Sequence, residues 1–149
     1  MAIDDAVTFT EWLTSSDTRM QFQRTDVLVF PSLRELGGTV IFEALGLGPV
    51  PVVADFCGPG DIVNPDVGYK IPLVNEEDML LRLQSVLKYL AEDRNHLETL
   101  RHHGMTYARE HLTWEAKARV VSKILLWASG RGPKPTLRPP QRVGKPSVG

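Results

Sequence analysis

Residues 26–54 read DVLVFPSLRELGGTVIFEALGLGPVPVVA, and this stretch decides the fold class. Its two ends, 26–30 and 50–54, are short and almost wholly apolar, which is typical of parallel strands covered on both faces. Between them, residues 38–45 have the pattern of a helix that glycines close. A strand, a helix and a second strand with short connections predict a βαβ unit with a right-handed crossover.

The alternation of strands and helices continues on both sides of this stretch. Two more strands are predicted, at 6–10 (AVTFT) and at 68–73, and a single helical turn is predicted at 61–63. We therefore expect an α/β fold: a partial Rossmann-like parallel sheet of about four strands flanked by helices, with a long helical C-terminal part. The helices are predicted at 15–24, from 75 to about 90, at 95–110 and at 114–129.

The composition is that of an ordinary folded domain with no charge-driven partner. Of 149 residues, 42% are hydrophobic and 23% are charged, and the formal net charge is -1, so we expect no binding to nucleic acid. The single cysteine, Cys57, cannot form an internal disulfide and is expected to be a buried thiol, and no metal site is expected. Because no apolar run approaches the ~18 residues of a spanning helix and the acidic start does not resemble a signal peptide, we expect a cytoplasmic protein.

The last residues have a different composition. We divide the chain into a folded domain, 1–130, with 12 basic and 18 acidic residues, and a basic, proline-rich tail, 131–149, that we expect to be disordered. Two interpretations of the tail remain open: a solvated linker, or a basic contact with a membrane or a partner. Its basic residues are Arg131, Lys134, Arg138, Arg142 and Lys145.

The loop after the strand at 26–30 has the features of an anion site. In open α/β sheets ligands bind at the carboxyl ends of the strands, where this loop lies. The backbone N–H groups of Gly37, Gly38 and Thr39 are expected to begin the next helix, so they and the positive end of the helix dipole can face a diphosphate.

Two carboxylates flank this amide cluster. Glu35 precedes it and Glu43 follows it, one to two turns into the helix. Carboxylates beside a phosphate are useful if they accept hydrogen bonds from hydroxyls on either side of it, and a nucleotide sugar has that form. The alternative interpretation is structural: Glu35 stabilises the helix dipole and Glu43 lies on a solvated face.

The stretch from 26 to 63 resembles the donor-binding C-terminal lobe of retaining glycosyltransferases with the GT-B architecture, the "glycosyl transferases group 1" family. The family signature is a strand, Pro-Ser, then two glutamates separated by seven residues, and Glu35 and Glu43 match it. The resemblance continues to HLTW at 111–114 and covers roughly residues 6–128.

This resemblance implies a function and a role for each site residue. Glu35 would be the catalytic-site residue that binds the donor's sugar ring, the amides of Gly37, Gly38 and Thr39 would face the diphosphate, and Glu43 would bind the ribose. The donor would be a nucleotide diphosphate sugar, the acceptor a hydroxyl group, and no metal or other cofactor would be needed.

The chain also departs from the family pattern. Glu35-Leu-Gly-Gly stands where members commonly read Glu-Gly-Phe-Gly, and two opening βα units with an Arg and a Lys for the leaving diphosphate are not in this sequence, nor is an acceptor lobe. Arg34 is either a substitute phosphate ligand or an exposed loop residue. The alternative function is therefore a nucleotide-binding or interaction module, or one chain of a split transferase that needs a partner.

The strand predicted at 6–10 poses a problem of pairing. In the usual strand order, two strands that this sequence lacks would separate it from the strand at 26–30. Unpaired backbone groups on both sides of such a gap would be unfavourable. We expect direct pairing of 6–10 with 26–30, exchange of 6–10 into a second copy, or coverage of the open edge by another chain.

Overall fold

The computed structural model describes residues 4–136. The predicted tail therefore lies mostly outside the described residues. In chain order the elements are the 3-10 helix η1 (Asp4–Ala6), α1 (Ser15–Gln23), β1 (Val27–Phe30), α2 (Thr39–Leu47), β2 (Val50–Ala54), α3 (Cys57–Ile62), β3 (Tyr69–Ile71), α4 (Glu76–Glu92), α5 (Arg94–Tyr107), the π-helical segment η2 (Ala108–Leu112) and α6 (Trp114–Ala128).

The three strands form one parallel sheet in the order β1-β2-β3. Val27 of β1 lies opposite Val50 of β2, and Val52 of β2 lies opposite Tyr69 of β3. Every residue of the central strand β2 is buried, as its apolar sequence predicts. The expected α/β class and parallel sheet are confirmed, with three strands among the described residues in place of about four.

Side chains that alternate along the strands belong to two apolar clusters, one on each face of the sheet. On one face, Leu28 and Phe30 pack with Ile41 and Leu45 of α2. On the other face, Val27 packs in a cluster whose buried residues come from the sheet, α4 and α5. The period of two along β1 thus divides its side chains between both layers of helices.

The start of α4 follows from its sequence. Asn75 is the N-cap, and its side chain accepts a hydrogen bond from the backbone N–H of Asp78 at 2.8 Å. Three acidic residues occupy the first turn, where the helix dipole favours negative charge. The predicted helix start is confirmed, and Leu90 near the other end of α4 is buried in the core.

The strand predicted at 6–10 is wrong. Ala6 ends the 3-10 helix, and residues 7–14, here called the N-terminal arm, contain no helix or strand and are all exposed. Phe9 is 94% exposed and Trp12 is fully exposed. The alternating sequence of residues 6–10 has the local pattern of a strand, but a strand also needs a neighbour to pair with. No strand of the sheet pairs with these residues, so direct pairing with β1 does not occur.

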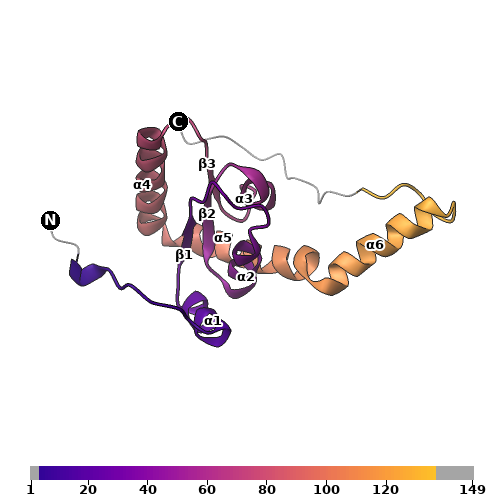
Figure 1. Cartoon of the computed structure of the whole chain (residues 1–149), viewed down its shortest axis with the longest axis horizontal. Coiled ribbons are helices and arrows are strands. Elements are labelled where there is room, and N and C mark those ends of the chain that lie inside the picture. Colours follow the sequence, from indigo (N-terminus) through magenta and orange to yellow (C-terminus); the bar gives the residue numbers. More distant parts are fainter. Residues whose placement is uncertain (1–3, 137–149) are drawn as a thin grey trace.

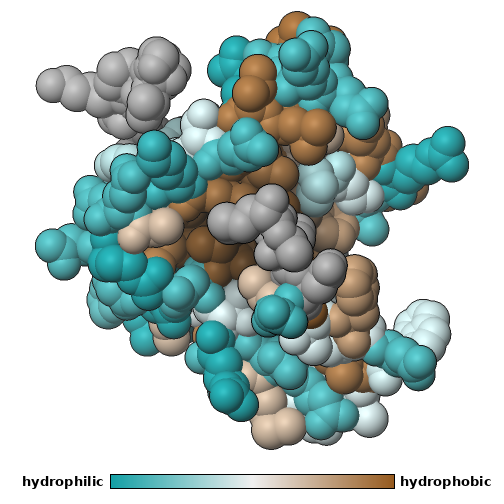
Figure 2. All heavy atoms as spheres, turned by 90° about the vertical axis from the view of Figure 1, so that its left-hand side faces the viewer, coloured by the Kyte–Doolittle hydropathy of each residue, from teal (hydrophilic) through white to brown (hydrophobic). Residues whose placement is uncertain are grey.

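The outer edge of β1 is free of any described strand. β1 pairs with β2 along one side only, and Val29 is 37% exposed. In Figure 1 β1 lies on the left of β2. Figure 2 shows that left-hand side of the molecule, where apolar side chains gather in a recess near the middle of the face. An open edge of this kind offers N–H and C=O groups to another strand.

The last helix projects from the rest of the fold. In Figure 1, α6 runs away from the sheet and from the helices packed on it, while the N-terminal arm leaves the opposite side. Ala116 is the one buried residue of α6. Among residues 4–136, no helix is both long enough and apolar enough to cross a membrane.

Candidate functional site

The loop from β1 to α2 places the predicted glycines at the start of the helix. Gly38 is the N-cap of α2 and adopts a left-handed backbone conformation, with φ of 57°. A Cβ atom at this position would lie 3.2 Å from Ile41 Cδ1 and 3.3 Å from Ile62 Cδ1. Glycine therefore suits both the backbone angle and the close packing against α3.

Glu35 binds the amide cluster that the sequence assigns to a ligand. Its Oε1 accepts hydrogen bonds from the backbone N–H groups of Gly37 and Gly38, both at 3.0 Å. These two bonds lower the pKa of the Glu35 carboxyl below its ordinary value of 4.5, and the bond from Gly38 has the larger effect. A diphosphate would have to compete with this carboxylate for the same donors.

Thr39, the third residue of the predicted amide cluster, is the first residue of α2 and is exposed. A first-turn N–H group has no acceptor within its own helix. The chain thus brings Glu35, Gly37, Gly38 and Thr39 together at one helix start. A ligand that approaches this start from solvent meets a carboxylate already in contact with two of the three residues.

Glu43 lies on the exposed side of α2 and faces a different neighbour, α1. It lines an open hollow of about 530 Å³, here called the α1–α2 hollow, together with residues from the start of α1. The hollow therefore offers a carboxylate acceptor, hydroxyl groups and a guanidinium cation. Its lining residues are Leu13, Ser15, Ser16, Thr18, Arg19 and Glu43.

The start of α1 is held by local hydrogen bonds. Thr14 is the N-cap, and its Oγ1 accepts from the backbone N–H of Asp17 at 3.2 Å. The same hydroxyl donates to Asp17 Oδ2 at 2.6 Å and lies 2.8 Å from Ser16 Oγ. Capping thus fixes the helix end that borders the α1–α2 hollow.

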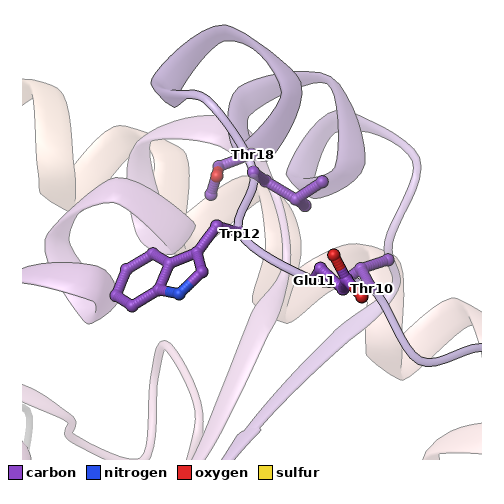
Figure 3. Close-up of a pocket in the computed structure, with 5 residues that line it drawn as sticks. Thr10, Glu11, Trp12 and Thr18 are labelled. Carbon is purple, nitrogen blue, oxygen red and sulfur yellow. The ribbon is translucent and has the colours of Figure 1, made fainter.

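A second open hollow, of about 680 Å³, adjoins the first one. It is lined by Thr10, Glu11, Trp12, Leu13 and Thr18, so the two hollows share Leu13 and Thr18. In Figure 3 the indole of Trp12 extends to the side of the chain opposite Glu11 and Thr10. The N-terminal arm therefore forms one wall of the space beside Glu43.

The residues of α1 are not predicted as part of the site. The sequence predicts a helix at 15–24, but nothing local shows that this helix packs against α2. The signal that was present is the pair Ser15-Ser16 with Arg19 one turn later, a combination that offers hydroxyl donors and a cation on one helical turn.

Other candidate residues near the sheet edge have structural contacts. Lys70 of β3 lies 3.0 Å from Asp55 Oδ1 and donates to the carbonyl of Gly60 at 3.2 Å. Arg34, for which the sequence left a phosphate ligand or an exposed loop residue as alternatives, is exposed.

The expectation of a buried Cys57 is wrong, because this thiol is exposed at the start of α3. Within the described part of the chain, no three His, Cys, Asp or Glu side chains are grouped for a metal ion.

The part of the chain that carries this site also matches a protein family. The family model described as "Glycosyl transferases group 1" matches residues 2–101, which include β1, α2, both glutamates and the helix that faces Glu43. The match extends through α4 and most of α5, whereas α6 lies beyond it. A search of curated proteins finds no match.

Proposed function

Because the chain belongs to the glycosyl transferases group 1 family, we propose that it is the donor-lobe portion of a retaining glycosyltransferase and binds a nucleotide diphosphate sugar. The position of Glu43 carries this proposal. Its carboxylate lies on the helix that begins at the amide cluster and borders the α1–α2 hollow. Ribose hydroxyls donating to Glu43 would lie within reach of a diphosphate at the start of the same helix.

Each part of the donor has a place in this arrangement. The nucleoside enters the α1–α2 hollow, where Glu43 accepts from the ribose and Leu13 gives an apolar contact. The diphosphate lies between Arg19 and the amides at the start of α2, and the sugar ring extends toward Glu35. No metal is needed in this arrangement, because donor N–H groups and a guanidinium meet the negative charge.

Glu35 has to leave its amides before a phosphate can use them. Its Oε1 accepts from both Gly37 and Gly38. When a diphosphate takes these donors, the freed carboxylate becomes available to accept from hydroxyls of the donor sugar. The N–H groups at the start of α2 therefore have an acceptor with and without ligand: the Glu35 carboxylate in the free chain and the diphosphate in the complex.

Transfer itself needs groups that the donor portion does not supply. Retaining transfer from a nucleotide sugar depends on stabilising the leaving diphosphate and an oxocarbenium-like centre. We propose that the acceptor lobe and the remaining cations come from a partner chain, or that a homo-oligomer forms through the free edge of β1. The isolated chain then has no turnover in the ordinary enzyme range of ~1 to 1000 per second.

A second candidate function is a nucleotide-binding or interaction module without its own catalysis. The contact between Glu35 and the two glycine amides favours it, because the anion site is already satisfied without a ligand. Pull-down from the native source followed by a turnover assay with a panel of nucleotide sugars separates the two functions. Turnover by the isolated chain at enzyme rates would contradict the need for a partner.

Binding is tested by calorimetry with a panel of nucleoside diphosphates. We expect Glu43→Ala to weaken binding about tenfold, because it removes a charged acceptor of ribose hydroxyls. Glu35→Ala should not weaken it, since a plain diphosphate has no sugar for Glu35 and gains the amides of Gly37 and Gly38. Glu92→Ala, at an exposed position on α4, is the control. Equal losses in the two site variants, or no loss, would contradict the proposed roles.

A further inference from the structure

The charges of this chain are divided sharply along the sequence. Residues 1–113 contain 17 acidic and 9 basic residues, whereas residues 114–149 contain one acidic and eight basic residues. The body of the molecule is therefore acidic, and the part that begins with α6 is basic. A net charge of -1 conceals this separation.

The basic part begins with a helix that has little contact with the body. α6 packs on η2 near its start and then projects away from the sheet (Figure 1). Its 15 residues correspond to about 22 Å at 1.5 Å per residue. Helices of this length are marginal in water without packing, so α6 is expected to meet a second surface.

Large apolar side chains on α6 are open to solvent. Trp114 is 87% exposed and Leu125 is 63% exposed. Along the outer part of the helix five apolar residues recur at i, i+1, i+4, i+5 and i+8 and form one apolar side, and the exposed Leu126 and Trp127 add further apolar surface. The residues at these positions are Val120, Val121, Ile124, Leu125 and Ala128.

The same helix carries three cations. Lys117, Arg119 and Lys123 are exposed, and Glu115 in the first turn is the one acidic residue of α6. At the far end the chain turns back, and Lys134 Nζ lies 5.6 Å from the ring centre of Trp127. The tip of α6 thus carries an aromatic ring and a cation in contact.

We propose that α6 lies on the surface of an anionic lipid bilayer, with its apolar side against the acyl chains and its cations among the headgroups. Exposed Trp and Leu beside Lys and Arg on one amphipathic helix have the chemistry of an interfacial helix. The acidic body would be repelled by such a surface, and the projection of α6 holds the body away from it.

This occupant fits better than the α6 helix of a second copy. Pairing of two α6 helices would bring their basic residues together, because both copies carry three cations and one acid on this helix. A neutral protein groove would satisfy the apolar side but not the excess positive charge. An anionic bilayer satisfies both, and the inference does not depend on nucleotide binding.

The test is co-sedimentation of the full chain with vesicles, in low salt. We expect binding to phosphatidylcholine vesicles that contain roughly one-third phosphatidylserine, little binding to pure phosphatidylcholine, and release as salt screens the attraction. Lys123→Gln should weaken binding about fivefold, since one basic residue near an anionic surface contributes ~1 kcal/mol. Lys88→Gln, an exposed lysine on α4, is the matched control and should leave binding unchanged.

Two further measurements keep the result decisive. Trp127→Ser should weaken binding to the anionic vesicles, and light scattering without lipid should give the same mass for this variant as for the unmodified chain. Equal binding to neutral and anionic vesicles, no binding to either, or equal losses in Lys123→Gln and Lys88→Gln would overturn the proposal. So would a dimer in solution that Trp127→Ser dissociates, because α6 would then cover a second copy.

Discussion

Oε1 of Glu35 lies 3.0 Å from the backbone nitrogen of Gly38, so a side chain of the loop occupies the anion position at the start of α2. The bond joins two residues of the predicted donor site and couples the charge of one to the left-handed backbone of the other. Any anionic ligand that uses this helix start must therefore change the environment of Glu35.

The first prediction concerns the titration of Glu35. Its pKa should lie below 4.5, because the amides of Gly38 and Gly37 stabilise the charged form. The stabilisation is present above the ordinary pKa and is lost as the pH falls through the lower, folded value. Addition of a nucleoside diphosphate should raise the pKa, since the ligand takes the amides and adds negative charge. Carbon-13 NMR of the carboxyl measures both, and a pKa at or above 4.5 without ligand would contradict the bond.

The second prediction separates two arginines of α1, Arg19 in the middle of the helix and Arg24 at its C-terminal cap. Arg19 lines the α1–α2 hollow, whereas Arg24 is the C-cap of the same helix and lies outside it. Arg19→Gln should weaken binding of a nucleoside diphosphate about fivefold, through loss of roughly 1 kcal/mol of charge-assisted hydrogen bonding at an exposed site. The unphosphorylated nucleoside should lose little.

Arg24→Gln is the matched control and should bind both ligands as the unmodified chain does. Calorimetry measures all four combinations of variant and ligand. A similar loss for nucleoside and diphosphate in Arg19→Gln would show that this residue does not meet the phosphates. A similar loss in both arginine variants would show a general effect of charge.

The sequence predicts well where one local pattern is sufficient. β1, β2 and α2 follow from apolar runs and closing glycines, and α4 begins where its helix is predicted to start. The predicted strand at 6–10 fails because a strand needs a partner, and pairing is not a local property. The α1–α2 hollow was missed for the same reason, since α1 and α2 meet only in the folded chain.

The contact between Glu35 and the glycine amides shows a second limit of prediction from the sequence. The sequence places a carboxylate, two glycines and a helix start in one loop, and all are where the pattern predicts. The sequence alone does not show whether the amides are free for a ligand or bind the loop's own carboxylate. That choice depends on the turn between Glu35 and Gly38, which the left-handed conformation of Gly38 completes.

The third prediction compares two glycines near the site. A Cβ atom at Gly58 would collide with the carbonyl oxygen of Leu36, so Gly58→Ala should push the loop that carries Glu35 away from α3. We expect a loss of about 1–3 kcal/mol in the free energy of unfolding. Gly46 lies on the exposed side of α2 with nothing within 4 Å of an added Cβ.

Gly46→Ala should therefore stabilise the protein by roughly 0.5–1 kcal/mol, because alanine restricts the unfolded chain and favours the helix. Denaturant unfolding of both variants gives the comparison. Equal stability of the two variants would contradict the close approach of α3 to the loop.

The last prediction concerns Asp26, which joins the start of the sheet to α5. Its Oδ2 lies 2.9 Å from Arg94 Nη1 and its Oδ1 lies 2.8 Å from Arg101 Nη2. The hydrogen bond from Arg94, and then the charges of Arg94 and Arg101, lower the pKa of Asp26 below 3.8. Asp26→Asn should cost about 1 kcal/mol of unfolding free energy at neutral pH, because Arg101, only 22% exposed, would lose the nearer of its two carboxylate partners, and solvent screening at the 47% exposed Asp26 keeps the loss small. The effect depends on pH: the stabilisation is present above the ordinary pKa and disappears as the pH falls through the lower, folded value, so the two proteins should approach equal stability in acid.

Glu92→Gln is the control, because its partner Lys88 lies 3.9 Å away with both side chains exposed, and its change should stay within about 0.5 kcal/mol. Urea unfolding from neutral to acid pH makes the measurement, and a constant difference between Asp26→Asn and the unmodified chain at every pH would refute the role of the Asp26 charge.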